Sequence, residues 1–421
     1  MNDTLVIAGP NASGKSTYVE TLVRGYANRY SADRVRYLTF RDTYGASDTG
    51  YYLQQRWNST EYDLVPTVEN SMGAGGEVLL NNPIMDMFGL RGLWDKPLIM
   101  LSSGELRKFQ LAKAISSDPK VLVIDSPFIG LDAPARGQFL EILRAISAGS
   151  DIKLVLVVAR DCDIPDFASE TLRMEAPATG AIPVDEACAR VAALGGSDPG
   201  YSVTVRLDDV SIRFGERTIL SGLDWEMKAG EKWAIEGCNG SGKSTLLSII
   251  CADIPQAYAC DVTLFDRRRG TGESIWDIKK HIGFVSPELH RAYLHNVPVL
   301  DVVASGLHDR KGMYVKTTDE HIPDCEFWMG IFGISHLRDR SFLRISSGEQ
   351  RLALLARAFV KDPDLLILDE PLHGLDEANG ERVRAVVEAF ASRKGKSLIM
   401  VSHYKEDFPP CIGRSLVLQK H

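Results

Sequence analysis

The sequence contains no long hydrophobic run of the kind that a membrane-spanning helix requires, about 18 or more consecutive apolar residues. The first residues, Met1 to Thr4, show neither the basic start of a secretion signal nor the arginine-rich pattern of an organelle-targeting segment. We therefore expect a soluble, cytoplasmic protein without a transmembrane segment.

Paired cysteines are absent as well. The 7 cysteines are an odd number, and none of them forms a C-x-x-C pair. This usage argues against a disulfide framework and against a zinc site. We expect reduced thiols that serve as small core residues, at positions 162, 188, 238, 251, 260, 325 and 411.

An excess of positive charge is also missing, since 48 Lys and Arg stand against 56 Asp and Glu and the net charge is −8. Such a balance disfavours binding driven by counterion release from nucleic acid. What the sequence does contain is apolar residues, 44% of 421, enough for two or three folded domains.

The most informative stretch, Gly237–Thr245, reads Gly-Cys-Asn-Gly-Ser-Gly-Lys-Ser-Thr and fits the phosphate-binding pattern G-x-x-x-x-G-K-[ST] at every fixed position. A strand-like segment at 232–236 precedes it, and helical apolar spacing follows at 244–250. In such a loop backbone N–H groups bind phosphates, Lys243 reaches the β- and γ-phosphate oxygens, and Ser244 offers its hydroxyl to Mg²⁺. The predicted nucleotide-binding residues are Gly237, Asn239, Gly240, Gly242, Lys243, Ser244 and Thr245. The alternative is a glycine-rich turn that matches by chance, with odds of roughly a few per cent.

A second complete phosphate loop stands near the N-terminus, after a strand-like segment at 5–8. Residues Gly9–Thr17 read Gly-Pro-Asn-Ala-Ser-Gly-Lys-Ser-Thr. Its predicted ligands to nucleotide are Gly9, Asn11, Gly14, Lys15, Ser16 and Thr17, with Ser16 toward Mg²⁺.

The spacing of further motifs repeats between the two halves. A Phe-Gly pair stands 14 residues before each Ser-Ser-Gly-Glu segment, which begin at Ser102 and Ser346. From that serine, 23 residues lead to the acidic end of an apolar strand, Asp125 or Asp369, and a Gly-Leu-Asp segment ends 7 residues later in both halves. The chain is therefore predicted to be a duplicated domain.

Alternation of short apolar strands with helical stretches predicts an α/β fold with a mainly parallel sheet in each half. We predict a first domain over 1–165, a linker over 166–200 and a second domain over 201–421. The linker is rich in Ala, Gly, Pro and acidic residues, with one short helix expected around 184–194.

In this order, the motifs resemble those of the ATP-binding cassette (ABC) family, twice and across essentially the whole chain. In that family a phosphate loop is followed by a Gln loop, a signature L-S-G-G-Q, a Walker B strand ending in Asp-Glu, a D-loop and a switch histidine. The signatures here are Leu101–Glu105 and Ile345–Glu349, with Ser for the first Gly and Glu for the Gln. Both keep a serine hydroxyl at a helix N-terminus, although one copy alone would also fit a plain helix cap. The resemblance implies two P-loop ATPase domains in tandem, each with a helical subdomain.

Cassettes of this family pair head to tail, so each ATP lies between the phosphate loop of one and the signature of the other. The resemblance implies a second site that joins its own phosphate loop to Ser102, Ser103 and Gly104 of the first half. There Asp369 would hold Mg²⁺ through water, Glu370 would polarise the attacking water, and His403 and Lys243 would contact the γ-phosphate. Phe214 falls where the family stacks an aromatic side chain on adenine.

The first site has altered catalytic positions. Ser126 follows Asp125 where the family has Glu, and a neutral hydroxyl is a poor acceptor for a proton from water. Arg160 takes the place of the switch histidine. We infer that this site binds ATP and Mg²⁺, with Ser16 and Asp125 toward the metal, and hydrolyses ATP slowly or not at all. The alternative, in which a nearby carboxylate replaces the Glu, stays open. The signature residues of this site are Ser346, Ser347 and Gly348.

Two further features depart from the family pattern. The first half begins directly at its phosphate-loop strand, which leaves no room for the usual N-terminal antiparallel strands or their adenine-stacking aromatic. At the Gln-loop position the second half has Pro287 followed by Glu288, and the first has Phe40, with Gln54 and Gln55 downstream. The usual coupling of that loop to a transmembrane partner is therefore in question.

Three segments, 253–258, 272–280 and 285–290, are similar to the twin cassettes of the ModF type, a group linked by name to molybdenum transport. This likeness implies two cassettes without a membrane domain. The expected function is a tandem ABC ATPase, monomeric as an internal pseudo-dimer, in which hydrolysis at the second site drives closure and opening of the two halves.

Several alternatives remain at this point. The chain would otherwise be the ATP-binding subunit of a transporter with a separate membrane partner, or a nucleotide switch that does not hydrolyse ATP. A ribosome-associated factor of the ABC-F class is disfavoured because the linker is short and acidic. No nucleic-acid partner is expected, and the sequence does not identify a cargo or client.

Overall fold

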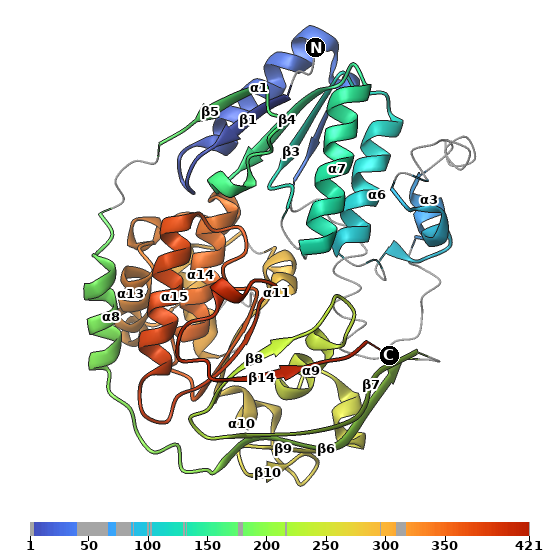
Figure 1. Ribbon diagram of the computed structural model, residues 1–421. Helices are drawn as coiled ribbons and strands as arrows, with labels where there is room; N and C mark the ends of the chain where they lie inside the picture. The colour runs from blue at the N-terminus through green and yellow to red at the C-terminus, as the bar shows by residue number, and fades with distance from the viewer. Residues whose placement is uncertain are drawn as a thin grey trace. The chain divides into compact units, whose positions relative to one another are not determined.

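A computed structural model describes residues 4–39, 66–72, 86, 88–98, 101, 103–128, 131, 133–175, 180–214, 217–294, 296–308 and 317–420 of the protein. These residues form two compact units, unit 1 drawn mainly from 4–175 and unit 2 mainly from 180–420. Each unit has a parallel sheet with helices packed on it, which confirms the predicted duplicated α/β fold (Figure 1). In the described ranges, no helix has both the length and the apolarity that a bilayer crossing requires.

The sheet of unit 1 has the strand order β2-β3-β4-β1-β5, with every pair parallel. Its strands are β1 Thr4–Ala8, β2 Val35–Leu38, β3 Val121–Asp125, β4 Lys153–Val158 and β5 Glu170–Arg173. The central strands are nearly continuous runs of Val, Ile and Leu because both of their faces are covered. Apart from an isolated bridge between Thr67 and Pro97, the described part of unit 1 has no antiparallel pairing.

Helices cover both faces of this sheet (Figure 1). They are α1 Lys15–Tyr30 on one face and α6 Ser103–Ser116 and α7 Ala133–Gly149 on the other, with α3 Val68–Met72 beside α6. Successive strand residues point to opposite faces of the sheet, so one strand contributes side chains to two hydrophobic cores. Ile7 joins the core beneath α1, whereas its neighbour Val6 joins the core beneath α6 and α7.

Unit 2 combines a parallel sheet of order β11-β12-β13-β8-β14 with an antiparallel sheet of order β10-β9-β6-β7. The strands are β6 Val203–Phe214, β7 Arg217–Lys228, β8 Lys232–Glu236, β9 Asp261–Leu264, β10 Arg267–Arg268, β11 Ile282–Val285, β12 Leu365–Asp369, β13 Ser397–Val401 and β14 Arg414–Val417. A shared core, with Val205 from one sheet and Ile235 from the other, joins them.

The helices of unit 2 are α8 Val184–Ala193, α9 Lys243–Ile250, α10 Ile275–Lys279, α11 Pro287–Ala292, α12 Val299–Ala304, α13 Ile322–Ile331, α14 Ser347–Phe359 and α15 Glu377–Ala391. Aromatic rings join three of them. Phe359 of α14 lies 5.0 Å from the Trp328 ring of α13 and 5.1 Å from the Phe390 ring of α15. These contacts hold α14, the helix of the second signature, in a fixed place.

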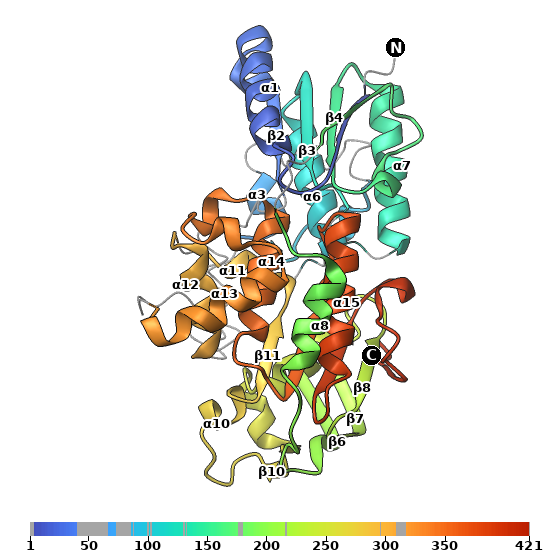
Figure 2. The same ribbon diagram turned by 90° about the vertical axis from the view of Figure 1, so that its left-hand side faces the viewer.

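Residues 166–200, predicted as a linker, are built into both units. Strand β5 pairs with β1 at the edge of the first sheet, with Leu5 opposite Glu170. Helix α8 confirms the helix expected around 184–194 and belongs to unit 2, where Figure 2 shows it beside α15. Arg382 of α15 donates to the Ile182 carbonyl at 2.8 Å, just before α8 begins. The domain boundaries at 165 and 201 stay a prediction.

The cysteines are all free, but the prediction that all of them are core residues was wrong. Cys251 and Cys325 are buried, whereas Cys162 and Cys238 are exposed. Cys238 lies in the second phosphate loop and Cys162 in a short turn after β4, and such connecting segments run over the surface.

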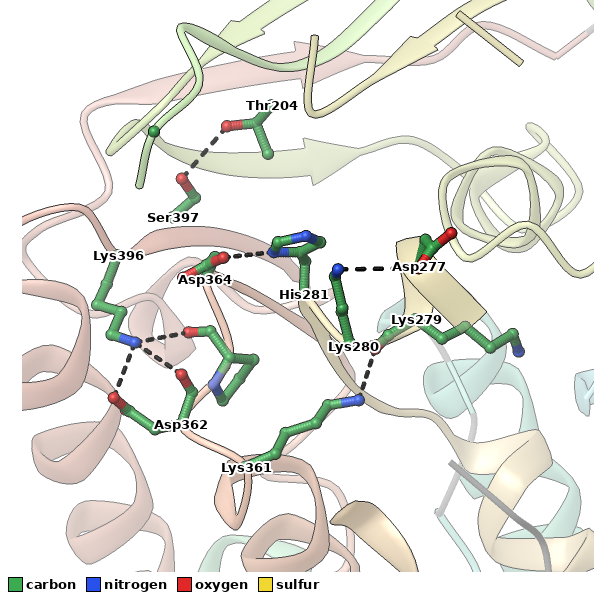
Figure 3. Close-up of polar contacts among 12 residues, drawn as sticks. Thr204, Asp277, Lys279, Lys280, His281, Lys361, Asp362, Asp364, Lys396 and Ser397 are labelled. Carbon is green, nitrogen blue, oxygen red and sulfur yellow. Dashed lines mark hydrogen bonds and ion pairs between the residues drawn. The ribbon is translucent and has the colours of Figure 1, made fainter. Parts of the chain in front are cut away.

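A group of charged side chains ties together the N-terminal ends of β11, β12 and β13 (Figure 3). Arg393 binds the Asp362 carboxylate through both arms at 2.6 and 2.9 Å, and Lys396 Nζ donates to it at 3.0 Å. Burial opposes ionisation of Asp362, but the hydrogen bonds from Arg393 and Lys396 outweigh it, so the pKa of this carboxyl lies below its ordinary value.

We expect the Asp362→Asn variant to be less stable than the parent at neutral pH, by a margin that shrinks in acid. Because the folded-state pKa lies below the unfolded value of about 3.9, the ionised carboxylate stabilises the fold above about pH 4, and this contribution disappears as the pH falls through the folded-state pKa. Urea unfolding of both proteins from about pH 7 to pH 3 measures the margin. Asp261→Asn, which removes an exposed partner of Arg268, is the control and should change little. A difference in unfolding free energy between Asp362→Asn and the parent that does not change with pH would contradict the lowered pKa of Asp362.

Candidate functional site

The second phosphate loop joins the end of β8 to the start of α9. At Gly237, with φ 152°, a Cβ would lie 2.4 Å from Ser241 Oγ and 2.8 Å from the Leu418 carbonyl oxygen, so only glycine fits. The Lys243 ammonium donates to the carbonyl oxygens of Gly237 and Cys238 at 2.6 and 3.0 Å. Ser244 follows Lys243 in the first turn of α9, where unpaired N–H groups favour phosphate.

Asp369 ends β12 as a buried carboxylate. Burial, together with the nearby carboxylates of Glu288 and Glu370, raises the pKa of Asp369 well above its usual range, against the opposing charges of Arg351 and Lys243. A cation beside this carboxylate would favour its ionised form. Asp369 is therefore suited to bind a metal ion or a cationic side chain.

Glu370 and His403 lie side by side at the ends of neighbouring strands. The register of β12 and β13 sets Asp369 opposite Val401, and the Glu370 N–H donates to the Val401 carbonyl at 2.9 Å. Glu370 Oε1 is 3.0 Å from His403 Nε2, and both side chains are largely buried. A carboxylate and an imidazole in this arrangement can orient a water molecule and a phosphate oxygen.

The first phosphate loop has the same position between β1 and α1. At Gly9 a Cβ would lie 2.4 Å from the Met174 carbonyl oxygen. Lys15 Nζ donates to the carbonyl oxygens of Gly9 and Pro10. Burial lowers the pKa of Lys15 to about 8, although the Asp125 carboxylate opposes the shift. In both loops the lysine ammonium is thus hydrogen-bonded to backbone carbonyl oxygens of its own loop.

Around Asp125 the first half has a different set of polar groups. Ser126 has the same left-handed backbone as Glu370, with φ 54° against 48°, and its N–H donates to the Val157 carbonyl at 2.9 Å. Its hydroxyl donates to Asp125 Oδ1 at 2.8 Å, and the Tyr37 hydroxyl lies 3.3 Å from Oδ2. Burial raises the pKa of Asp125 despite these bonds. In the first half, the position that corresponds to Glu370 therefore carries a hydroxyl, which is hydrogen-bonded to the neighbouring Asp125.

Arg160 stands two residues after the end of β4, as His403 stands two residues after the end of β13. Its Nε is 3.4 Å from Asp163 Oδ2, and Arg136 reaches the same carboxylate at 2.7 Å. Arg160 is thus held by an acidic residue of its own turn.

The local structure gives a reason for Glu349 in the second signature, where the family pattern L-S-G-G-Q has Gln. Ser346 is the N-cap of α14, and its hydroxyl accepts from the Glu349 N–H at 3.3 Å, while the Glu349 carboxylate accepts from the Ser346 N–H at 2.7 Å. Glu at this position completes a capping box. In the first signature, α6 begins at Ser103 and includes Gly104, and Ser102 lies outside the described residues.

The predicted adenine and Gln-loop positions are only partly described. Phe214 ends β6, paired through its backbone with Arg217, but its side chain is outside the description. Phe40, Gln54 and Gln55 also lie outside it. Pro287 and Glu288 open α11, capped by Ser286, whose hydroxyl accepts from the Leu289 N–H at 3.0 Å.

Sequence reasoning missed two polar contributors to these sites. Tyr37 gives no signal beyond its place on a strand, and its contact with Asp125 follows from the pairing of β2 with β3. Arg351 stands five residues after Ser346, directly before the apolar run 352–356, a pattern that could have indicated a buried charge with a fixed partner.

The ABC transporter family model matches residues 1–129 and 220–373, which include both phosphate loops and both strand ends described above. The chain belongs to this family, whose members bind ATP, typically with Mg²⁺.

Among its relatives, the ABC transporter ATP-binding protein ModF of Escherichia coli (strain K12) is 36% identical, over 98% of this chain and 91% of ModF. An uncharacterised ABC transporter ATP-binding protein of Schizosaccharomyces pombe is 27% identical, over 90% of this chain and 82% of its own length. The solved structure of a nucleotide-free ATP-binding cassette from an ABC transporter is 21% identical, with a TM-score of 0.44, and covers 52% of this chain and 88% of that one. The chain is thus similar to ModF over nearly the full length of both proteins.

The residues present fit a magnesium ion bound together with ATP. No three His, Cys, Asp or Glu side chains converge on a metal position in the part of the chain that the structure describes. Mg²⁺ with a nucleotide needs few protein ligands, because phosphate oxygens and water supply most of the six. One hydroxyl and one carboxylate per half, Ser244 with Asp369 and Ser16 with Asp125, would meet that need.

Proposed function

We propose that the chain is a tandem ATP hydrolase with two composite ATP sites, in which each phosphate loop works with the signature of the other half. Hydrolysis occurs mainly at the site of the second phosphate loop and opens the two halves that ATP binding has closed. The observation that carries this proposal is the 3.0 Å contact between Glu370 and His403, set against Ser126 and Arg160 at the matching places of the first half.

At the second site each residue has a distinct task. Lys243 and the loop N–H groups hold the phosphates, Glu370 accepts a hydrogen bond from the attacking water, and His403 donates to a γ-phosphate oxygen as charge develops. Mg²⁺, held by Ser244 and through water by Asp369, would neutralise charge on the β- and γ-phosphate oxygens. Phe214 stacks on adenine, and Ser102, Ser103 and Gly104 close the site from the first half. The products are ADP and phosphate.

At the first site ATP is held more than it is cleaved. Gly9, Lys15 and Ser16 bind the phosphates as their counterparts do, and Ser346, Ser347 and Gly348 close the site. The Ser126 hydroxyl is already engaged with Asp125 and is a poor acceptor for a proton from water. This ATP would therefore keep the two halves together.

A second candidate function is that of the ATP-binding subunit of a transporter whose membrane partner is a separate chain. The observation that favours it is the 36% identity to ModF, an ABC transporter ATP-binding protein. Both candidates place the protein in the cytoplasm. Co-purification of an integral membrane protein with the ATP-loaded Glu370→Gln variant would support the transporter subunit. The remaining options are a switch without turnover, which steady ATP hydrolysis would exclude, and an ABC-F-like ribosome factor, which absence of the ATP-loaded Glu370→Gln variant from sedimented ribosomes would exclude.

The head-to-tail arrangement predicts unequal effects of one substitution in the two signatures. Ser103→Arg places a bulky cation in the wall of the second site, so steady-state turnover should fall as strongly as in Lys243→Ala, about 100-fold or more. Ser347→Arg is the matched control and should chiefly lower ATP retention at the first site. Phosphate release and the number of bound nucleotides are measured for both. Normal turnover in Ser103→Arg would show that the halves do not share sites in this way.

A further inference from the structure

The signature helix α14 carries a buried guanidinium that reaches the end of the neighbouring strand β12. Arg351 is 2% exposed. Its Nη2 donates to the Asp369 carbonyl oxygen at 2.9 Å and to that of Glu370, and its Nε lies 3.4 Å from the Pro371 carbonyl oxygen. One side chain thus binds three consecutive peptide groups around the carboxylate of Glu370.

These peptide groups have an unusual conformation that needs support. Glu370 adopts φ 48°, a left-handed backbone that is unfavourable for a residue with a Cβ. Its N–H is fixed by the Val401 carbonyl, and its own carbonyl is fixed by Arg351. The direction of the Glu370 side chain depends on this peptide orientation, because the backbone angles decide which rotamers are allowed and the buried site leaves little room for others.

The residue before Arg351 connects the same helix turn to the signature loop. The Gln350 amide donates to the carbonyl oxygens of Phe342 and Ile345 at 2.7 and 3.1 Å, and its carbonyl oxygen lies 2.9 Å from His290 Nε2 of α11. Ile345 immediately precedes Ser346, the N-cap of α14. A displacement of the signature would therefore move the anchor of Glu370.

The first half offers an internal comparison. Arg107 holds the equivalent place, five residues after Ser102, and is also buried. It donates to the Thr39 carbonyl at 3.2 Å and lies 3.4 Å from Gln110 Oε1. The arginine thus serves different acceptors in the half that has Ser126 in place of Glu.

We propose that Arg351 is a positioning residue for Glu370, which makes the placement of this carboxylate depend on the seating of the second signature helix. The inference rests on the proposed role of Glu370 in hydrolysis. It adds a path from the segment next to the second signature to the backbone of Glu370: Gln350 bonds the carbonyl of Ile345, which precedes Ser346, and the adjacent Arg351 bonds the carbonyl of Glu370.

The test compares Arg351→Lys, Arg351→Met and Arg351→Ala with Arg357→Met as the matched control, because Arg357 is a second buried arginine of α14 but donates to Ser305. We expect kcat to fall about 10- to 100-fold in Arg351→Met while KM and the affinity for ATP change by less than about threefold, because the chemical step loses its geometry and binding does not. Arg351→Lys should keep more kcat than Arg351→Met, since an ammonium can still reach one carbonyl. Arg357→Met should leave kcat within about twofold of the parent, since its partner Ser305 lies away from β12 in the chain.

A purely structural role would give a different pattern. Thermal unfolding identifies any variant that fails to fold, and millimolar guanidinium added to Arg351→Ala then tests the role in a folded protein. Partial recovery of kcat in Arg351→Ala, without recovery in Glu370→Gln, supports positioning. Unchanged kcat in a folded Arg351→Met, or no recovery with guanidinium, overturns it. If Glu370→Gln itself retains normal turnover, the proposed function fails first, so the two failures are distinguishable.

Discussion

The Glu370→Gln variant should lose nearly all steady-state ATP hydrolysis, by about 10²- to 10⁴-fold, while it keeps its affinity for ATP. The amide fills the same space but cannot accept a proton or polarise water as the carboxylate does. Its neighbour His403, 3.0 Å away in the parent, retains a hydrogen-bonding partner, so the site keeps its shape. Phosphate release measures the loss, and equilibrium dialysis with ATP measures binding.

Ser126→Ala is the matched control for this experiment. Ser126 has the backbone conformation of Glu370, but its hydroxyl is bonded to Asp125. Its removal should leave steady-state turnover within about twofold of the parent. Equal losses in Ser126→Ala and Glu370→Gln would contradict the asymmetric account.

Substitution of the two phosphate-loop lysines should also lower turnover unequally, with the larger loss at the second site. Lys243→Ala removes the charge that holds the β- and γ-phosphates at the hydrolysing site, and turnover should fall by about 100-fold or more. Lys15→Ala removes the equivalent charge at the retaining site, so one bound nucleotide is lost but turnover should stay at least about tenfold above that of Lys243→Ala.

Nucleotide counting is the control that makes this comparison sound. Each lysine variant should lose one of the two nucleotides that the parent binds, because each loop has its own lysine, bonded to its own carbonyl oxygens. Identical turnover in the two variants, with identical nucleotide loss, would mean that the sites are equivalent.

Much of the fold could be predicted from the sequence because its strongest signals are local. A phosphate loop needs glycine at fixed places, and Gly237 and Gly9 stand where any Cβ would meet backbone or side-chain atoms. The strands before the loops and before Asp125 and Asp369 are short apolar runs that are typical of buried parallel strands. The repeated spacing then predicts the duplication.

The remaining features depend on contacts between distant segments. Arg351 meets the Glu370 carbonyl because α14 packs against the end of β12, and no spacing rule gives that approach. Strand β5 joins the first sheet through backbone pairing that its polar residues do not signal. The exposure of Cys238 was mispredicted because cysteine is usually buried, whereas here it occupies a surface loop.

The central claim is that the two ATP sites of one chain differ in chemistry. The most direct measurement loads the protein with ATP labelled at the γ-phosphate in the absence of Mg²⁺, adds Mg²⁺, and follows bound ATP and released phosphate through a single turnover. The account predicts two phases, with one ATP per chain cleaved quickly and the other still intact after many half-lives of the first. A single phase in which both ATP molecules are cleaved at the same rate would contradict it.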